Sequence, residues 1–236
     1  MTTEKAPMII VDSLLGGAGR ASGAVAIIDV FRAFTTAAVA LANHASKIVM
    51  VGSVQEALAL RDAGIVQACM GEVGGVMPPG FDFGNSPFEV ATHDFGGQAV
   101  AQRTSAGTQG IVAASGADAL YASSLVTARC TARALAAARP ACITLVAMGH
   151  EGVERTDEDE LCALHLRNLL EGRAGDAEAV RRVILAGKEA ARFLDPSSGH
   201  GHPRDLDIAL DIDRYDFAVR VTIEGGRPVG RMEVRG

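Results

Sequence analysis

The sequence lacks an excess of positive charge. Its 236 residues include 22 Lys and Arg against 28 Asp and Glu, which gives a formal net charge of −6. Proteins that bind nucleic acids usually carry a basic face that neutralises phosphates, and here the Lys and Arg residues are scattered. DNA, RNA and anionic membrane surfaces are therefore not expected as partners.

Long apolar runs and clustered cysteines are also absent. No stretch approaches the roughly 18 apolar residues of a membrane span. The first residues, MTTEKAPMIIVDSLLGG, include Glu4 and Asp12 and resemble neither a signal peptide nor a transit peptide. The four cysteines form no CxxC pair, which argues against a zinc site and a disulfide framework. Together these absences predict a cytoplasmic protein with buried free thiols.

Short β-branched runs alternate with Ala- and Leu-rich helical patterns over the first two thirds of the chain. This alternation predicts an α/β fold, layered α/β/α, with a mixed and largely parallel sheet. We expect strands over residues 25–30, 47–51, 66–70, 98–103, 119–122 and 141–148. We expect helices over 33–44, from Ser53 to Gly64, after 104–110 and over 126–138.

The last third of the chain has a different pattern. Helical periodicity covers 157–171, 176–187 and 188–194, and a polar loop over 196–203 follows. Residues 217–234 alternate as two strands joined at Gly225 and Gly226, which predicts a β-hairpin. We expect one domain over 1–236, with a sub-lobe over about 157–236 as an alternative. A homodimer is compatible with an enzyme of this size.

Polar residues gather where ligands bind in open α/β sheets, beyond the carboxyl ends of the strands. A Gly- and Pro-rich loop over 74–87 is also long enough to suggest a function. Carboxylates with helix N-termini predict Mg²⁺ and a bound phosphate ester. The candidates are Asp29, Arg32, Glu72, Asp82, Asn85, Ser86, Ser105, Gly107, Thr108, Glu158 and Asp159.

Each of these features also has a purely structural interpretation. Asp29 could cap the following helix, as Asp often does. The segment SAGTQG, from Ser105 to Gly110, could be an ordinary helix start, because it lacks the lysine of a P-loop. Glu158 and Asp159 could form the acidic first turn that a helix dipole favours.

Other motifs do not support an alternative chemistry. Gly17-Ala18-Gly19 resembles part of a dinucleotide fingerprint, but Ser22 replaces the third glycine, and we expect a flexible turn there. No GxSxG segment is present, which argues against a serine hydrolase. His200 and His202 lack a third histidine nearby and are expected to be solvated.

Five segments together resemble the Mg²⁺-dependent 2-phosphosulfolactate phosphatases of coenzyme M biosynthesis. Order and spacing match from about Ala24 to Ala163, and the GFDxGNSP pattern is the most specific part. The segments are IDVFRAFTT from Ile28, Gly71-Glu72, GFDFGNSP from Gly80, TSAGT from Thr104 and EDELCA from Glu158.

The resemblance implies hydrolysis of 2-phospho-3-sulfolactate to 3-sulfolactate and phosphate. It makes Asp29 and Arg32 the expected catalytic pair and Glu72, Asp82, Glu158 and Asp159 the expected Mg²⁺ ligands. The small anionic substrate would be bound by Thr35, Thr36, Asn85, Ser86, Ser105, Gly107 and Thr108.

The sequence departs from the family pattern at two positions close to these segments. Val73 stands where the family usually has arginine, and Ala106 stands where it usually has asparagine. Losing an arginine removes a strong planar contact to an anion. Two alternatives therefore remain. One is a phosphatase whose substrate lacks a sulfonate, and the other is a non-catalytic or regulatory anion-binding relative.

Overall fold

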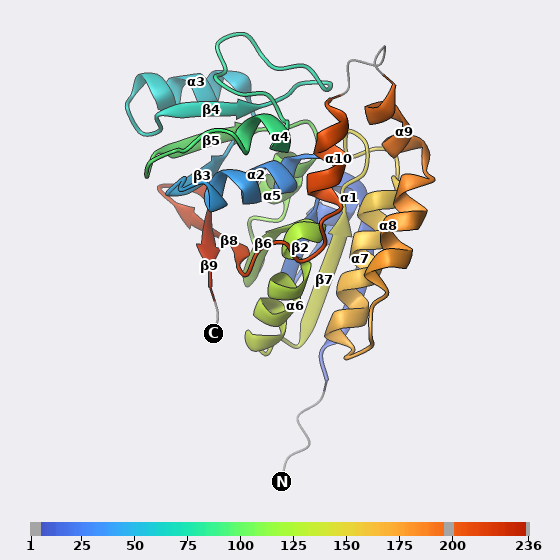
Figure 1. The fold of residues 1–236 in the computed structure, drawn as a ribbon. Helices are drawn as coiled ribbons and strands as arrows, with labels where there is room; N and C mark the ends of the chain where they lie inside the picture. The colour runs from blue at the N-terminus through green and yellow to red at the C-terminus, as the bar shows by residue number, and fades with distance from the viewer. Residues whose placement is uncertain (1–5, 196–200, 235–236) are drawn as a thin grey trace.

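The computed structural model describes residues 6–195 and 201–234, and these form one nine-stranded mixed sheet with helices on both faces (Figure 1). Across the sheet the order is β1 (Met8–Ser13), β7 (Cys142–Ala147), β2 (Ala24–Ile28), β6 (Ala119–Ser123), β8 (Ala218–Glu224), β9 (Arg227–Glu233), β3 (Lys47–Met50), β5 (Ala99–Arg103) and β4 (Ala68–Gly71). The predicted α/β class and the C-terminal hairpin are both confirmed.

The hairpin lies in the middle of the sheet and separates two parallel groups. One group is β1, β7, β2 and β6, and the other is β3, β5 and β4. The three pairings between the groups are antiparallel, so the second group runs opposite to the first. The sheet turns strongly between them, and in Figure 1 β4 and β5 run roughly horizontally while β7 runs nearly vertically. This turn allows strand ends from both groups to reach one pocket.

Helices cover the sheet because its central strands are apolar on both faces. In β2, Val25 and Ile27 pack into one core cluster, and Ala24, Ala26 and Ile28 pack into another. The helices are α1 (Leu14–Arg20), α2 (Ala33–Ala42), α3 (Val54–Asp62), α4 (Pro87–Val90), α5 (Gly107–Ala113), α6 (Ala128–Ala137) after a 3₁₀ turn (Leu125–Thr127), α7 (Asp157–Leu170), α8 (Ala177–Leu185), α9 (Lys188–Leu194) and α10 (Pro203–Ala209). Among the described residues, no helix is both long and apolar enough to span a membrane.

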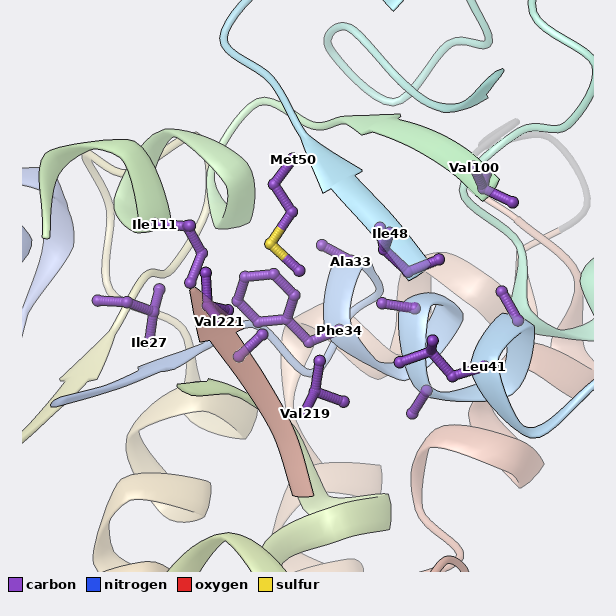
Figure 2. Packing of buried hydrophobic residues seen from close by; sticks show 14 of the residues in the cluster. Ile27, Ala33, Phe34, Leu41, Ile48, Met50, Val100, Ile111, Val219 and Val221 are labelled. Carbon is purple, nitrogen blue, oxygen red and sulfur yellow. The ribbon is translucent and has the colours of Figure 1, made fainter. Parts of the chain in front are cut away.

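Phe34 at the start of α2 lies at the centre of the larger core cluster. Figure 2 shows its ring surrounded by Ile27 of β2, Met50 of β3, Ile111 of α5 and Val219 of β8. Close packing of this kind resists displacement. It therefore fixes the first turn of α2, whose backbone N–H groups lie beside the predicted site.

Several local predictions are confirmed. Ser53 caps α3 by accepting from the backbone N–H of Glu56 at 3.1 Å, and Gly64 follows with a positive φ of 71°. Residues 72–86 contain no helix and no regular strand, as the Gly- and Pro-rich composition predicted. Helices α7, α8 and α9 follow the predicted helical periodicity.

Four elements were not predicted, namely β1, α1, α4 and α10. The prediction of a flexible turn at Gly17-Ala18-Gly19 was wrong, because these residues lie inside α1. Small residues suit this helix, since a Cβ on Gly17 would lie 2.9 Å from Asp12 Cγ. Tertiary packing thus overrides the low helix propensity of glycine. His200 lies outside the described residues, and His202 is the N-cap of α10.

Candidate active site

A pocket lies where four strands end and α9 packs over them. The ends of β2, β4, β5 and β7 contribute residues, and so does the loop before α4. The lining is Asp29, Phe31, Arg32, Glu72, Gly74, Gly75, Asn85, Ser105, Ala106, Gly149, His150, Glu151, Glu189, Arg192 and Phe193. The predicted strand ends therefore converge, and they do so around charged side chains.

Asp29 follows β2 and points its carboxylate at two helix N-termini. Its Oδ1 accepts from the backbone N–H of Ala33 at 2.9 Å, and the backbone N–H of Gly107 at the start of α5 also donates to this carboxylate. Gly107 must be glycine, because a Cβ there would lie 2.8 Å from Asp29 Oδ2. The helix ends that were expected to bind substrate phosphate thus bind the chain's own carboxylate.

The environment of Asp29 raises the pKa of its carboxyl group. The pKa of Asp29 is raised to about 6, because burial and the nearby Glu72 charge together outweigh the N–H donors of Ala33 and Gly107 and the Arg32 charge, which lower it. A carboxyl group with a pKa near neutrality can exchange a proton at working pH. Asp29 is therefore suited to acid or base chemistry.

Glu72, at the end of β4, organises the neighbouring loops. Its Oε1 accepts from the backbone N–H of Ser105 at 2.5 Å, and its Oε2 accepts from Gly75 N at 2.6 Å and Ser105 Oγ at 3.1 Å. The Ser105 hydroxyl in turn accepts from the N–H of Gly74 at 3.0 Å. Glu72 thus fixes two walls of the pocket relative to each other.

Arg32 supplies a guanidinium group to the pocket, three residues after Asp29. Its side chain is only 10% exposed, and its Nη1 donates to Asp205 Oδ2 at 3.1 Å. The guanidinium carbon lies 5.4 Å from the centre of the Phe193 ring. Such a held, planar guanidinium is well suited to bind phosphoryl oxygens.

Glu158 and Asp159 are buried next to Asp29 and do not line the pocket directly. Asp159 accepts from Val30 N at 2.7 Å and from Gly149 N at 2.8 Å, so it joins the ends of β2 and β7. Burial, with a contribution from Glu158, raises the pKa of Asp159 well above its usual value. Burial raises the pKa of Glu158 to about 7, and its Oε2 has no hydrogen-bond partner.

Only part of the predicted substrate-binding set faces the pocket. Asn85 and Ser105 line it, and the buried Oδ1 of Asn85 has no hydrogen-bond partner. The others lie in the interior behind the pocket wall. Thr35 donates to the carbonyl of Val30, Ser86 donates to Asp205, Thr108 donates to the carbonyl of Thr104, Thr36 is fully buried, and Gly107 contacts Asp29.

Asp82 lies apart from the other predicted metal ligands. Its Oδ2 accepts from the backbone N–H of Cys69 at 2.8 Å and pairs with Arg61 at 3.1 Å. Cys69 is near the start of β4, whereas the pocket is at the end of that strand. Asp82 therefore lies away from the pocket, because the loop carries it back along β4.

The sequence predicted the helix over 188–194 but not which of its side chains line the pocket. Glu189, Arg192 and Phe193 of α9 line it, as does His150 after β7. Glu189 and Arg192 form an ion pair at 2.9 Å with the i, i+3 spacing of a helix. That spacing was the available signal, but it equally describes an exposed helix face.

The donors present are compatible with a magnesium ion. Within the described residues, no three His, Cys, Asp or Glu side chains are grouped to hold a metal by themselves. Mg²⁺ needs only one or two carboxylates, because water and substrate phosphate complete its coordination. Asp29 and the partnerless Oε2 of Glu158 offer such oxygens, and a cation would offset the cost of crowding these buried charges.

Comparison with known proteins shows the family to which the chain belongs. The family model described as 2-phosphosulpholactate phosphatase matches residues 12–221. A probable 2-phosphosulfolactate phosphatase of Bacillus subtilis is 30% identical over 206 residues, which are 86% of this chain and 88% of the relative. A relative of the same name in Thermus thermophilus is 35% identical over 73% of this chain and 71% of its own length. Another in Deinococcus radiodurans is 32% identical over 79% of this chain and 80% of its own length.

These matches define the class of the protein. It is a phosphatase, a hydrolase that acts on phosphoric monoesters. The match covers nearly the whole described chain and includes every strand end that reaches the pocket. The chain belongs to the 2-phosphosulfolactate phosphatase family.

Proposed function

We propose that this chain is a Mg²⁺-dependent phosphatase that hydrolyses 2-phospho-3-sulfolactate to 3-sulfolactate and phosphate. The observation that carries the proposal is the presence of Asp29 and Arg32 in one pocket, each held in place by contacts with the chain itself. The names of the relatives suggest the substrate.

The phosphoryl group is bound by Arg32. Its guanidinium offers several donors in one plane, which match the oxygens of a phosphate monoester. Asn85 and Ser105 face the same space and provide neutral polar groups for the remaining oxygens. Positioning and charge stabilisation of this kind account for most catalysis in phosphoryl transfer.

Asp29 orients the nucleophile. Donors from Ala33 and Gly107 hold its carboxylate, so it does not need to reorganise during the reaction. Asp29 and Glu158 would hold the metal. When bound there, Mg²⁺ would neutralise charge on the phosphoryl oxygens.

Arg192 supports a substrate with a second anionic group. It is a second guanidinium in the pocket lining, whereas Val73 is 46% exposed and does not line the pocket. An arginine from α9 thus contributes the kind of contact that position 73 lacks. We propose that it faces the sulfonate or carboxylate of the substrate.

A phosphate-release assay on purified protein tests the proposal. The substrates are 2-phospho-3-sulfolactate and 2-phospholactate, each assayed with Mg²⁺ and with excess chelator. We expect Mg²⁺-dependent release and a preference for the sulfonate, which Arg192→Ala should reduce. Equal turnover of both substrates would remove sulfonate specificity and leave the phosphatase, whereas no turnover on a wider set of phosphomonoesters would contradict the enzyme.

A further inference from the structure

A buried carboxylate outside the pocket contacts Arg32. Asp205 lies in the first turn of α10, is fully buried and does not line the pocket. Its Oδ2 accepts from Arg32 Nη1 at 3.1 Å. This carboxylate lies 173 residues further along the chain than the arginine that it holds.

Asp205 is itself fixed by three further donors. Its Oδ1 accepts from Ser86 Oγ at 2.7 Å and from Phe88 N at 3.0 Å, and its Oδ2 also accepts from His202 N at 3.1 Å. These donors come from the turn that begins α4 and from the N-cap of α10. Both oxygens are therefore satisfied, and the carboxylate has a single orientation in which one edge faces Arg32.

This arrangement determines where the guanidinium of Arg32 points. The planar group carries five N–H donors in a rigid fork. Asp205 fixes one Nη, and the Phe193 ring, 5.4 Å away, lies against the guanidinium face. Since the group is planar, these two contacts fix the direction of the rest of the fork.

We propose that Asp205 is the positioning residue that aligns Arg32 for binding the phosphoryl group of the substrate. The inference rests on the proposed function, in which Arg32 binds that group. It assigns α10 a part in the site, although none of its residues lines the pocket. The rival explanation is structural, because Asp205 also forms a capping box with His202 and joins α10 to α4.

A double-mutant cycle separates these two explanations. In the wild-type background, Asp205→Asn places an amide N–H₂ where Arg32 needs an acceptor, and we expect kcat/KM to fall about a hundredfold. In an Arg32→Ala background the same change should cost no more than about twofold, because no guanidinium remains to be aligned. Equal losses in both backgrounds would overturn the proposal.

Chemical rescue adds a readout that a structural role would not affect. Added guanidinium ion should restore part of the activity of Arg32→Ala, because Asp205 still offers its anchor. It should restore none in Arg32→Ala with Asp205→Asn. Rescue of equal size in the two proteins contradicts a positioning role for Asp205.

Asp213→Asn is the matched control. Asp213 also accepts a backbone N–H, from Arg129 at 2.7 Å, and pairs with the Arg129 guanidinium at 2.9 Å, away from the pocket. We expect wild-type kcat/KM from this variant. If Asp205→Asn does not fold, Asp205→Glu keeps the charge and displaces it by one methylene, and wild-type kcat/KM from Asp205→Glu would overturn the proposal.

Calorimetric binding of inorganic phosphate distinguishes failure of this inference from failure of the proposed function, since it needs no turnover. Weaker phosphate binding by both Arg32→Ala and Asp205→Asn supports the inference even if the wild type hydrolyses nothing. Wild-type phosphate affinity in Asp205→Asn, with lost affinity in Arg32→Ala, contradicts it even if the wild type is an active phosphatase.

Discussion

The two parallel halves of the sheet place carboxylates at or behind one pocket, and these carboxylates differ in burial and in hydrogen-bond partners. The half with β2 and β7 supplies Asp29 and positions Glu158 and Asp159 behind it, and burial raises the pKa of all three. The half with β4 and β5 supplies Glu72, whose oxygens accept three hydrogen bonds from the adjoining loops. The first group is buried and crowded, and the Oε2 of Glu158 has no hydrogen-bond partner, whereas both oxygens of Glu72 have donors from the loops.

This difference separates reactive from organising carboxylates. Crowded buried carboxylates are costly unless a cation or a proton joins them. A carboxylate saturated by backbone N–H groups gains those bonds in the folded state and orders the loops that donate them. We therefore expect changes in the first group to affect activity and changes at Glu72 to affect mainly stability.

The largest effect on activity is expected from Asp29→Asn. The amide keeps the shape of the side chain and loses the negative charge that orients the nucleophile, so kcat/KM should fall on the order of 10²- to 10⁴-fold. Stability to urea should change less than in Glu72→Gln, because the loss of one acceptor for the N–H of Ala33 or Gly107 is partly offset by the removal of a buried charge next to other carboxylates. Activity within tenfold of wild type would show that Asp29 is not the catalytic carboxylate.

Glu72→Gln should affect stability more than Asp29→Asn does. One oxygen becomes an N–H₂ group that faces the N–H donors of Ser105 or Gly75, which leaves buried donors unpaired. The free energy of unfolding should fall by about 1 to 3 kcal/mol. Urea unfolding of both variants in parallel measures the contrast, and equal stability of the two would remove the proposed distinction.

The pH dependence of stability is a third test of the first group. A carboxyl group whose pKa is raised on folding stabilises the protein below its ordinary pKa, and that contribution is lost as pH rises through the folded value. For Asp29, from 3.8 to about 6, the loss is about 3 kcal/mol. Metal-free protein should therefore become less stable as the pH rises from about 4 to about 7. The lower limit is set by the ordinary pKa values of these carboxyl groups, and the upper limit by the folded-state pKa values of Asp29 and Glu158, about 6 and about 7.

Added Mg²⁺ should reverse this loss. Because the ion binds the charged carboxylates, its stabilising effect should be greater above the folded pKa values than below the ordinary ones. Thermal unfolding with and without Mg²⁺ at several pH values measures this. A Mg²⁺ effect independent of pH would contradict binding at this carboxylate group.

The sequence predicted that Asp29, Arg32 and Glu72 lie together, because strand ends are local features. Asp29 follows an apolar run directly, so its place at the edge of the sheet depends on few residues. Asp205 illustrates the opposite case. Its partners Arg32 and Ser86 are far away along the chain, and nothing local to Asp205 marks that contact.

The loop after β4 shows why Asp82 lies away from the pocket that the other predicted residues surround. After leaving β4, the chain returns alongside it, with Phe83 bridged to Met70 and Asp82 N donating to the carbonyl of Cys69. Composition predicted a loop here but not its path. Asp82 therefore reaches Arg61 of α3 and not the carboxyl end of the strand.

The smallest effect is expected from Asp82→Asn. The side chain of Asp82 is 41% exposed, and its pair with Arg61 is partly open to solvent, so its loss should cost less than about 1 kcal/mol. The asparagine oxygen can still accept the N–H of Cys69, which keeps the loop against β4. Activity and Mg²⁺ dependence should match those of wild type in the phosphate-release assay. A Mg²⁺ requirement raised tenfold would return Asp82 to the metal site and extend the reactive group into the β4 half of the sheet.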